Sequence, residues 1–260
     1  MASVIRQWPA EQVWQDVYPL LPDFSVEILP EVDSSNTELM RRARAGRTDP
    51  VLLVAEHQTA ARGRLGREWR TNRGDALTFS LGLPLAPRDW SGLSLVAGVA
   101  IAEALHPDLG LKWPNDLWWQ DRKVGGILVE TAGGGDAGAS RYVVVGLGLN
   151  IVAPATFDGL RTLPAGLRQL SPGITATAAL GAIVPPLVRA LLDFAEHGFA
   201  PWQARFNARD VLRGRAVVLS DGRQGTAASV DADGVLQLRT AAGWETVRSA
   251  EVSVRPAAAA

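Results

Sequence analysis

The sequence predicts an α+β protein, in which a mixed domain of about two hundred residues is followed by a small β-barrel. In the first part of the chain, apolar runs of strand length occur between longer segments with helical spacing. After Asn207, short strand candidates recur about every ten residues and are separated by Asp-Gly and Ala-Gly turns. Strands and turns at that spacing are typical of a small all-β unit of the barrel type.

The first domain is expected to span residues 1–210, with a short helix in an N-terminal extension of residues 1–23. Asp33 to Asn36 have the composition of a helix N-cap, and Glu38 stands three residues after Ser35 as a capping box. Gly46 is predicted to end that helix. Further helices are predicted at residues 91–106, 176–196 and 201–206, and strands at 24–29, 51–56, 76–83, 111–113, 117–119, 124–131 and 141–151.

The second unit is expected to span residues 211–256 and to be followed by a disordered tail of residues 257–260. Its strands are predicted at residues 216–220, 225–230, 235–240 and 244–248. Residues 133–140, in the first domain, have the composition of an exposed hairpin tip.

Composition excludes several classes of function. The net charge is −1, so no overall basic field is available to bind nucleic acid or an anionic membrane. The chain has no cysteine, which excludes a disulfide framework and a thiolate nucleophile. Residues 1–10 do not form a signal peptide, and no segment is expected to supply the roughly 20 apolar residues that span a bilayer. A cytoplasmic location is the default expectation.

Lysine is scarce in a chain that is rich in arginine. Of the 26 basic residues, 24 are arginine and two are lysine, Lys112 and Lys123. A lysine ammonium is a compact, strongly hydrated point charge, whereas the guanidinium is a planar fork. We therefore interpret these two positions as ones that require the lysine geometry.

Three segments combine charged side chains with glycine or proline. Residues 61–67 (ARGRLGR) form a loop after a predicted buried strand, where glycines permit close approach of a ligand and arginines can bind phosphate or carboxylate. Residues 112–117 (KWPNDL) present Asn115 and Asp116 from a rigid turn. Residues 122–130 (RKVGGILVE) place Lys123 at the start of a strand that opens with adjacent glycines, a pattern that favours a closely approaching ligand.

Together these segments resemble the biotin protein ligases. The matching segments occur in the order and at the approximate intervals of that family: DSSN (33–36), QTAARGRLGREW (58–69), GLSL (92–95), LKWPNDL (111–117), DRKVGGILVE (121–130) and GLGLNI (146–151). EVSVR (251–255) resembles the end of the family's small SH3-like barrel. The resemblance covers about residues 24–256 and implies a mixed-sheet catalytic domain of the biotin/lipoate ligase type with a small C-terminal SH3-like β-barrel.

The resemblance implies a two-step reaction. Biotin and ATP, bound with Mg²⁺, form biotinyl-5′-AMP and pyrophosphate. A lysine of the biotin carboxyl carrier protein domain of acetyl-CoA carboxylase, or of a related carboxylase, then attacks this mixed anhydride. The sequence shows no dedicated metal cage, which fits a magnesium ion held mainly by phosphates.

The matching positions also imply the site residues. Catalytic roles are expected for Arg64, Lys123, Asp116 and Lys112. Biotin binding is expected from Ser34, Ser35, Asn36, Gln58, Arg62, Gly63, Arg64, Lys123, Gly125 and Gly126. ATP binding is expected from Arg64, Arg67, Trp69, Asn115, Asp116, Asn150 and Arg255.

The expected roles agree with the chemistry of the side chains. Arg62 and Arg64 would neutralise the acid carboxylate and the α-phosphate, two anions that must approach in line. Gly125 and Gly126 would leave room for the bicyclic ring beside the strand. Asp116 would attract or deprotonate the incoming lysine.

Two positions depart from the family pattern. Ala61 stands where the first glycine of the family's loop is usual, and a positive φ there would cost about 1 kcal/mol or more. Ser35 replaces the usual threonine and keeps the hydroxyl. Only about thirty residues precede the matching region, too few for a winged helix-turn-helix, so no repressor function is expected. The chain is expected to be a monomer or a homodimer.

Three alternatives stay open at this point. A lipoate or octanoate ligase of the same fold would bind its acid in a long hydrophobic tunnel. A non-catalytic biotin or nucleotide sensor would explain the altered residue at Ala61. A general binding module could use the nine tryptophans, although they are scattered along the chain.

Overall fold

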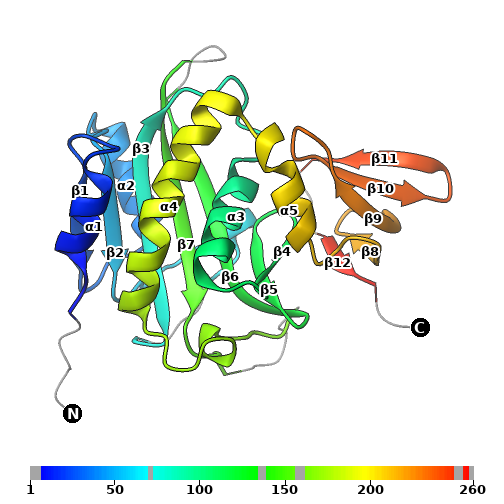
Figure 1. Ribbon diagram of the computed structural model, residues 1–260, viewed down its shortest axis with the longest axis horizontal. Coiled ribbons are helices and arrows are strands. Elements are labelled where there is room, and N and C mark those ends of the chain that lie inside the picture. The colour runs from blue at the N-terminus through cyan, green and yellow to red at the C-terminus, as the bar shows by residue number, and fades with distance from the viewer. Residues whose placement is uncertain (1–6, 70–72, 134–138, 156–161, 249–253, 258–260) are drawn as a thin grey trace.

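A seven-stranded mixed sheet forms the centre of the first domain (Figure 1). The computed structural model describes residues 7–69, 73–133, 139–155, 162–248 and 254–257. The strands are β1 (Ser25–Leu29), β2 (Val51–Ala55), β3 (Ala76–Leu85), β4 (Gly110–Lys112), β5 (Asp116–Trp119), β6 (Arg122–Ala132) and β7 (Arg141–Asn150), in the order β1-β2-β3-β7-β6-β5-β4. β1 and β2 pair in parallel and the other neighbours are antiparallel, which confirms the mixed sheet.

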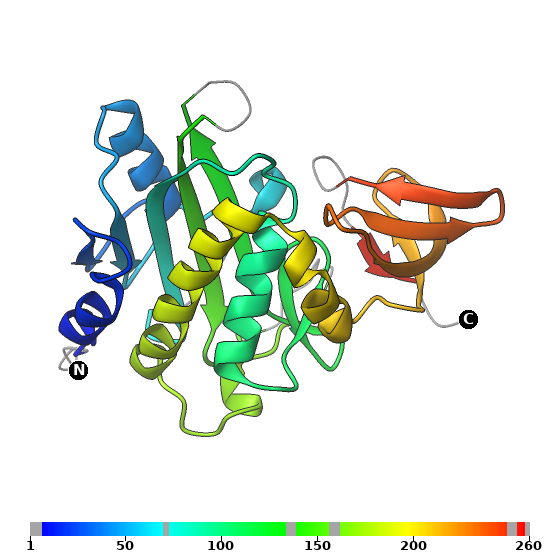
Figure 2. The ribbon, with the colours of Figure 1, turned by 45° about the horizontal axis from the view of Figure 1, so that its top comes forward.

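The α-helices lie on both faces of this sheet. They are α1 (Ala10–Val17), α2 (Ser35–Arg44), α3 (Leu93–Leu105), α4 (Ala176–His197) and α5 (Gln203–Arg209), with short 3₁₀ turns η1 (Arg64–Gly66), η2 (Leu167–Gln169) and η3 (Ala200–Trp202). α3 and α4 lie side by side over one face, whereas α2 packs on the other (Figures 1 and 2). The helix predicted at 201–206 is η3 followed by α5.

Successive residues of each strand point to opposite faces of the sheet, so the two faces carry different side chains. On β3, Phe79 and Leu81 point into the large core beneath α3 and α4. Ser80 and Gly82 point to the opposite face, where Leu39 of α2 packs in a second, smaller core. The part of this second face that α2 does not cover is available for a binding site.

The long apolar helix α4 corrects one expectation from the sequence. Its 22 residues include a window of mean hydropathy 1.6, long and apolar enough to cross a membrane, contrary to the expectation that no such segment exists. Many of its apolar side chains, among them Leu180, Leu187 and Phe194, are fully buried against the sheet and α3. Packing in the protein core accounts for the apolar composition of this helix.

The start of α2 differs by one residue from the predicted cap. Ser34 is the N-cap, and its hydroxyl accepts a hydrogen bond from Thr37 N. Glu38 makes ion pairs with Arg41 and Arg42 instead of completing a capping box. The cap lies earlier because the Ser35 hydroxyl is turned into the sheet face, where it has other partners.

The second unit is a five-stranded antiparallel sheet. It contains β8 (Ala216–Leu219), β9 (Gln224–Val230), β10 (Leu236–Thr240), β11 (Gly243–Val247) and β12 (Val254–Pro256), in the order β11-β10-β9-β8-β12. No pairing joins β11 to β12 among the residues that the structure describes, so the expected barrel is an open, SH3-like sheet there. The predicted boundary at 210/211 lies between α5 and β8.

The second sheet contacts the first domain at a buried hydrogen bond. The indole Nε1 of Trp113 donates to the carbonyl of Gly234, in the turn between β9 and β10, at 3.1 Å. In the predicted tail, Ala257 N donates to Ala216 O at 2.8 Å, whereas residues 258–260 lie outside the described residues. Of the predicted hairpin tip, residues 134–138 lie outside them as well.

Candidate active site

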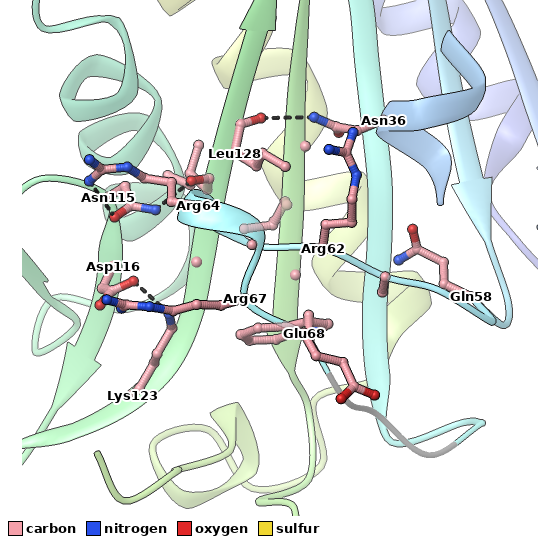
Figure 3. Close-up of a pocket in the computed structure, with 18 of the residues that line it drawn as sticks. Asn36, Gln58, Arg62, Arg64, Arg67, Glu68, Asn115, Asp116, Lys123 and Leu128 are labelled. Carbon is pink, nitrogen blue, oxygen red and sulfur yellow. Dashed lines mark hydrogen bonds and ion pairs between the residues drawn. The ribbon is translucent and has the colours of Figure 1, made fainter. Parts of the chain in front are cut away.

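A cavity of about 930 Å³ lies on the sheet face opposite α3 and α4 (Figure 3). The start of α2, the 58–69 loop, the 112–116 turn, and strands β6 and β7 all contribute to its wall. Of the site residues predicted from the sequence, those that line it are Ser34, Ser35, Asn36, Gln58, Arg62, Gly63, Arg64, Arg67, Trp69, Lys112, Asn115, Asp116, Lys123, Gly126 and Asn150. A cavity of this size can accommodate an organic acid together with a nucleotide.

Two predicted residues do not line this cavity. Gly125 faces the core side of β6, because successive strand residues point to opposite faces. A β-carbon there would lie 2.8 Å from Gly148 O, so the glycine is needed for strand packing. Arg255 lies on β12 in the second sheet and is solvent-exposed.

One end of the cavity is charged and is centred on Asp116. The Asp116 Oδ1 atom lies 2.6 Å from Lys123 Nζ, and Oδ2 lies 3.4 Å from Lys112 Nζ. Burial alone would raise the pKa of Asp116, but the charges and hydrogen bonds of the two lysines outweigh it and hold that pKa below its usual value. Burial lowers the pKa of Lys112, and Asp116 opposes that shift. Both lysines of the chain therefore form ion pairs with the same carboxylate.

Two further cations stand beside this trio (Figure 3). Arg64 Nη1 donates to Asn115 Oδ1 at 3.3 Å, and Asn115 Nδ2 donates to Ile127 O at 2.7 Å. Burial lowers the pKa of Arg64 from its usual value, and the charge of Arg67 acts in the same direction, whereas Asp116 opposes both. This end thus concentrates positive charge where water is partly excluded, an arrangement suited to bringing two anions together.

Trp69 forms part of the wall near the charged end. Its ring packs on the bare backbone of Gly148, where a β-carbon would lie 2.7 Å from Trp69 Cε2. Lys123 Nζ lies 5.4 Å from the ring centroid. The buried indole Nε1 has no hydrogen-bond partner in the described part of the chain, so a donor is left for a bound molecule.

The other end of the cavity is made of neutral polar side chains joined by hydrogen bonds. Gln58 Oε1 accepts from Ser35 N at 2.8 Å and from Ser35 Oγ at 3.2 Å. The fully buried Ser80 hydroxyl lies 2.7 Å from Ser35 Oγ and 2.6 Å from Asn36 Oδ1. One hydroxyl proton cannot serve both acceptors at once, so this end retains capacity to accept a hydrogen bond from a ligand N–H.

The backbone floor between the two ends depends on glycines on the cavity side of β6 and β7. Gly126 pairs with Gly148, and Gly146 lies two residues before Gly148 on the same face. A β-carbon at Gly146 would overlap Asn36 Oδ1. A β-carbon at Gly126 would crowd Lys123 Nζ at 3.1 Å. Each glycine therefore leaves space for one named side chain of the site.

Sequence reasoning did not assign Ser80, Gly146 or Gly148 to the site. The signal was present as period-two spacing in GLGLN (146–150), in which both glycines and Asn150 share one face. Asn150 lies 4% exposed and donates to Ala165 O at 3.0 Å, so it also supports the backbone beside Lys123. Ser80 gave no such signal, because its partners come from a helix far away in the sequence.

The arginine loop is folded back on itself. Gly63 N donates to Arg67 O at 2.7 Å, and Trp69 N donates to Ala61 O at 3.0 Å. Positive φ angles occur at Leu65 (58°) and Gly66 (68°), but not at Ala61. The strain considered for Ala61 is therefore absent, and the left-handed turn lies four residues later.

Comparison with known proteins identifies the family. The model of the biotin/lipoate A/B protein ligase family matches residues 29–150. The bifunctional ligase/repressor BirA of Escherichia coli is 32% identical over 243 residues, which cover 90% of this chain and 75% of that protein. The chain belongs to the biotin protein ligase family. The biotin–[acetyl-CoA-carboxylase] ligase of Paracoccus denitrificans, also a member, is 31% identical over 86% of this chain and 98% of its own length.

A solved structure of the family has the same fold. The biotin protein ligase of Aquifex aeolicus, determined in complex with biotin and ATP, superposes with a TM-score of 0.74 at 27% identity. The match covers 89% of this chain and 99% of that one. Both the mixed sheet and the small C-terminal sheet are therefore features that this chain shares with a family member.

Proposed function

We propose that this member of the family is a biotin protein ligase that makes biotinyl-5′-AMP from biotin and ATP and transfers biotin to a carrier lysine. The observation that carries the proposal is a single cavity with cations at one end and neutral hydrogen-bonding groups at the other. Biotin has the matching distribution of charge, with a neutral ureido head group at one end and an anionic carboxylate at the other. The relative from Paracoccus denitrificans is named a biotin–[acetyl-CoA-carboxylase] ligase, which supports biotin as the acid.

In the first step, a carboxylate oxygen of biotin attacks the α-phosphorus of ATP. The new bond forms the mixed anhydride while the bond to the β-phosphate oxygen breaks and pyrophosphate leaves. Lys123 and Arg64 lie where they can neutralise both anions, and their positions are fixed by Asp116 and Asn115 before the substrates arrive. Trp69 would form a wall against the nucleotide.

Magnesium would enter on the nucleotide. The described residues contain no group of three or more histidine, aspartate or glutamate side chains that could hold a metal ion, and Asp116 is already paired with two lysines. Such a site fits an ion held by phosphate oxygens and water. When bound, Mg²⁺ would neutralise phosphate charge and assist departure of pyrophosphate.

In the second step, a carrier lysine, after its ammonium has lost a proton to water, attacks the acyl carbon as the neutral amine. The bond between that carbon and the phosphate oxygen breaks, and AMP leaves with the oxygen. Asp116 is a carboxylate of the cavity wall at the charged end that can guide that amine. Because its pKa is held below the usual value, it is a weak base, and electrostatic attraction of the incoming ammonium is the role that its environment supports. The amine proton would then pass to the departing phosphate or to water.

The neutral end distinguishes biotin from lipoate. Ser35, Gln58 and Asn36 present oxygens and an amide to the cavity, whereas a dithiolane ring offers neither hydrogen-bond donors nor a carbonyl acceptor. Lipoate has no ring N–H to donate to the acceptor capacity that remains at this end, so it would lack a hydrogen bond that biotin can make. We therefore favour the biotin ligase over the lipoate or octanoate ligase and over the non-catalytic sensor.

Isotope exchange between ATP and pyrophosphate tests the proposal. We expect exchange that depends on biotin and is not supported by lipoate, followed by a mass increase on one lysine of a biotin carboxyl carrier domain. Exchange with lipoate alone, or with neither acid, would reject the assignment. The carboxylase that supplies the carrier, a cytoplasmic location and the lack of operator binding in a gel shift stay predictions.

A further inference from the structure

Glu130 ends the RKVGGILVE segment and lies beside the neutral end, but no role follows for it from the resemblance or from the proposed reaction. It lies on β6 on the same face as Gly126 and Leu128, just beyond the cavity wall. Its side chain is 25% exposed, so its interactions are partly shielded from water.

The first partner of Glu130 is the arginine loop. Arg62 Nη2 donates to Glu130 Oε1 at 3.1 Å and to Oε2 at 3.2 Å, while Arg62 Nε donates to Thr37 Oγ1 at 3.1 Å. Arg62 is thereby directed toward α2 and β6, on the opposite side of the cavity from Arg64 (Figure 3). The two arginines of one loop serve different ends of the cavity.

The second partner of Glu130 is the neutral end itself. Asn36 Nδ2 donates to Glu130 Oε2 at 3.0 Å and to Leu128 O at 3.2 Å, so both amide protons are used. Asn36 Oδ1 then faces Ser80. Glu130 thus fixes which way the Asn36 amide points, with the oxygen toward the serines of the neutral end.

We propose that Glu130 is a positioning residue that clasps the arginine loop to the neutral end of the cavity and orients Asn36 there. The proposal rests on the assignment of that end to the acid's head group. Glu130 also balances the charge of Arg62, which leaves the net positive charge at the Lys123 end. A substrate carboxylate is then directed to one end only.

A rival role for Arg62 is direct contact with the acid, in which Glu130 would be incidental. The two roles differ in how the residues combine. If Arg62 acts through Glu130, removing both residues costs no more than the worse single loss, because one interaction is being removed. If Arg62 binds the acid independently, the two losses multiply.

The test compares Glu130→Gln, Arg62→Ala and the double variant with wild type and a matched control. Glu27→Gln is that control. Glu27 on β1 pairs with Arg42 of α2 at 2.8 Å, so the substitution removes an arginine–glutamate pair away from the cavity, on the helix that carries Asn36. ATP–pyrophosphate exchange gives KM for biotin, KM for ATP and kcat. Trypsin cleavage after Arg64 or Arg67, without ligands, reports whether the loop is held.

We expect Glu130→Gln to raise KM for biotin about fivefold, since a partly exposed ion pair and one hydrogen bond are modest interactions. KM for ATP should stay within about twofold, cleavage of the loop should become faster, and the double variant should resemble the worse single variant. The proposed role of Glu130 would be overturned if Glu130→Gln had the same KM for biotin and the same rate of loop cleavage as Glu27→Gln. It would also be overturned if the losses multiplied in the double variant. If wild type showed no biotin-dependent exchange, the proposed function would fail. The cleavage rates would still show whether Glu130 holds the arginine loop.

Discussion

The two ends of the cavity use buried polar groups in opposite ways. At the charged end, Asp116 is held between Lys112 and Lys123, and an arriving anion can share these cations with it. At the neutral end, Ser35 and Gln58 are joined by short, directional hydrogen bonds without formal charge. Buried charges need partners to be tolerated, whereas neutral groups need correct orientation. The charged end is therefore suited to the reaction, and the neutral end to recognition.

The largest expected effect comes from removing a cation at the charged end. Lys123→Gln keeps a polar side chain, one bond shorter, but loses the charge that neutralises the reacting anions. We predict that kcat/KM for biotin-dependent exchange falls by about a thousandfold. The fold should be retained, as judged by circular dichroism and thermal melting. A decrease of less than tenfold would show that the charged end does not govern the reaction.

A matched pair of glycine substitutions separates the two ends. Gly146→Ala would push a β-carbon into Asn36 and so disturb the neutral end, whereas Gly148→Ala would push one into Trp69. Overpacking of this kind typically costs about 1–3 kcal/mol, or roughly fivefold to 150-fold in affinity. We predict that Gly146→Ala raises mainly KM for biotin and that Gly148→Ala raises mainly KM for ATP. If both variants raised the same parameter, the division into two ends would be wrong.

Asp210 extends the comparison to a buried carboxylate whose charge is poorly compensated. One of its oxygens, Oδ2, has no hydrogen-bond partner among the described residues, and burial raises its pKa to about 6. This pKa lies above that of an aspartate in the unfolded chain, so protonation of Asp210 stabilises the folded protein. That contribution to stability is fully present below about pH 4 and is lost as the pH rises through about 6.

Asp210→Asn, which resembles the protonated form, should therefore stabilise the protein near neutral pH. We predict a gain of about 1 kcal/mol in the free energy of unfolding at pH 7.5 and little difference near pH 4. Denaturant unfolding at both pH values measures this. A loss of stability at pH 7.5 would mean that the charged carboxylate has a partner that compensates its burial.

The smallest expected effect is self-labelling by the acyl adenylate. Both lysines of the chain are bonded to Asp116, and Lys112 is only 6% exposed. An ammonium held by a carboxylate is a poor nucleophile. Mass spectrometry after prolonged turnover without a carrier should find little biotin on either lysine. Heavy labelling of Lys123 would show that its pairing with Asp116 does not persist during the reaction.

The sequence predicted local structure and the charged end well, because both depend on residues close together in the chain. Lys112, Asn115 and Asp116 lie in one turn, and Lys123 begins the strand that pairs with it. The partners of Ser80 and Glu130, by contrast, come from α2 and from the arginine loop, and no local pattern connects them. Gly125 and Gly126 point to opposite faces of β6, so only one of them can face the cavity. Which one does so is known only once the register of the strand is known.

The most direct test is a crystal structure with biotin and a non-hydrolysable ATP analogue. The two-ended cavity predicts the ureido ring against Ser35, Asn36 and Gln58, with the carboxylate and α-phosphate together within hydrogen-bonding distance of Lys123 and Arg64. A biotin bound in the reverse direction, or both ligands placed away from Arg64 and Lys123, would contradict the account.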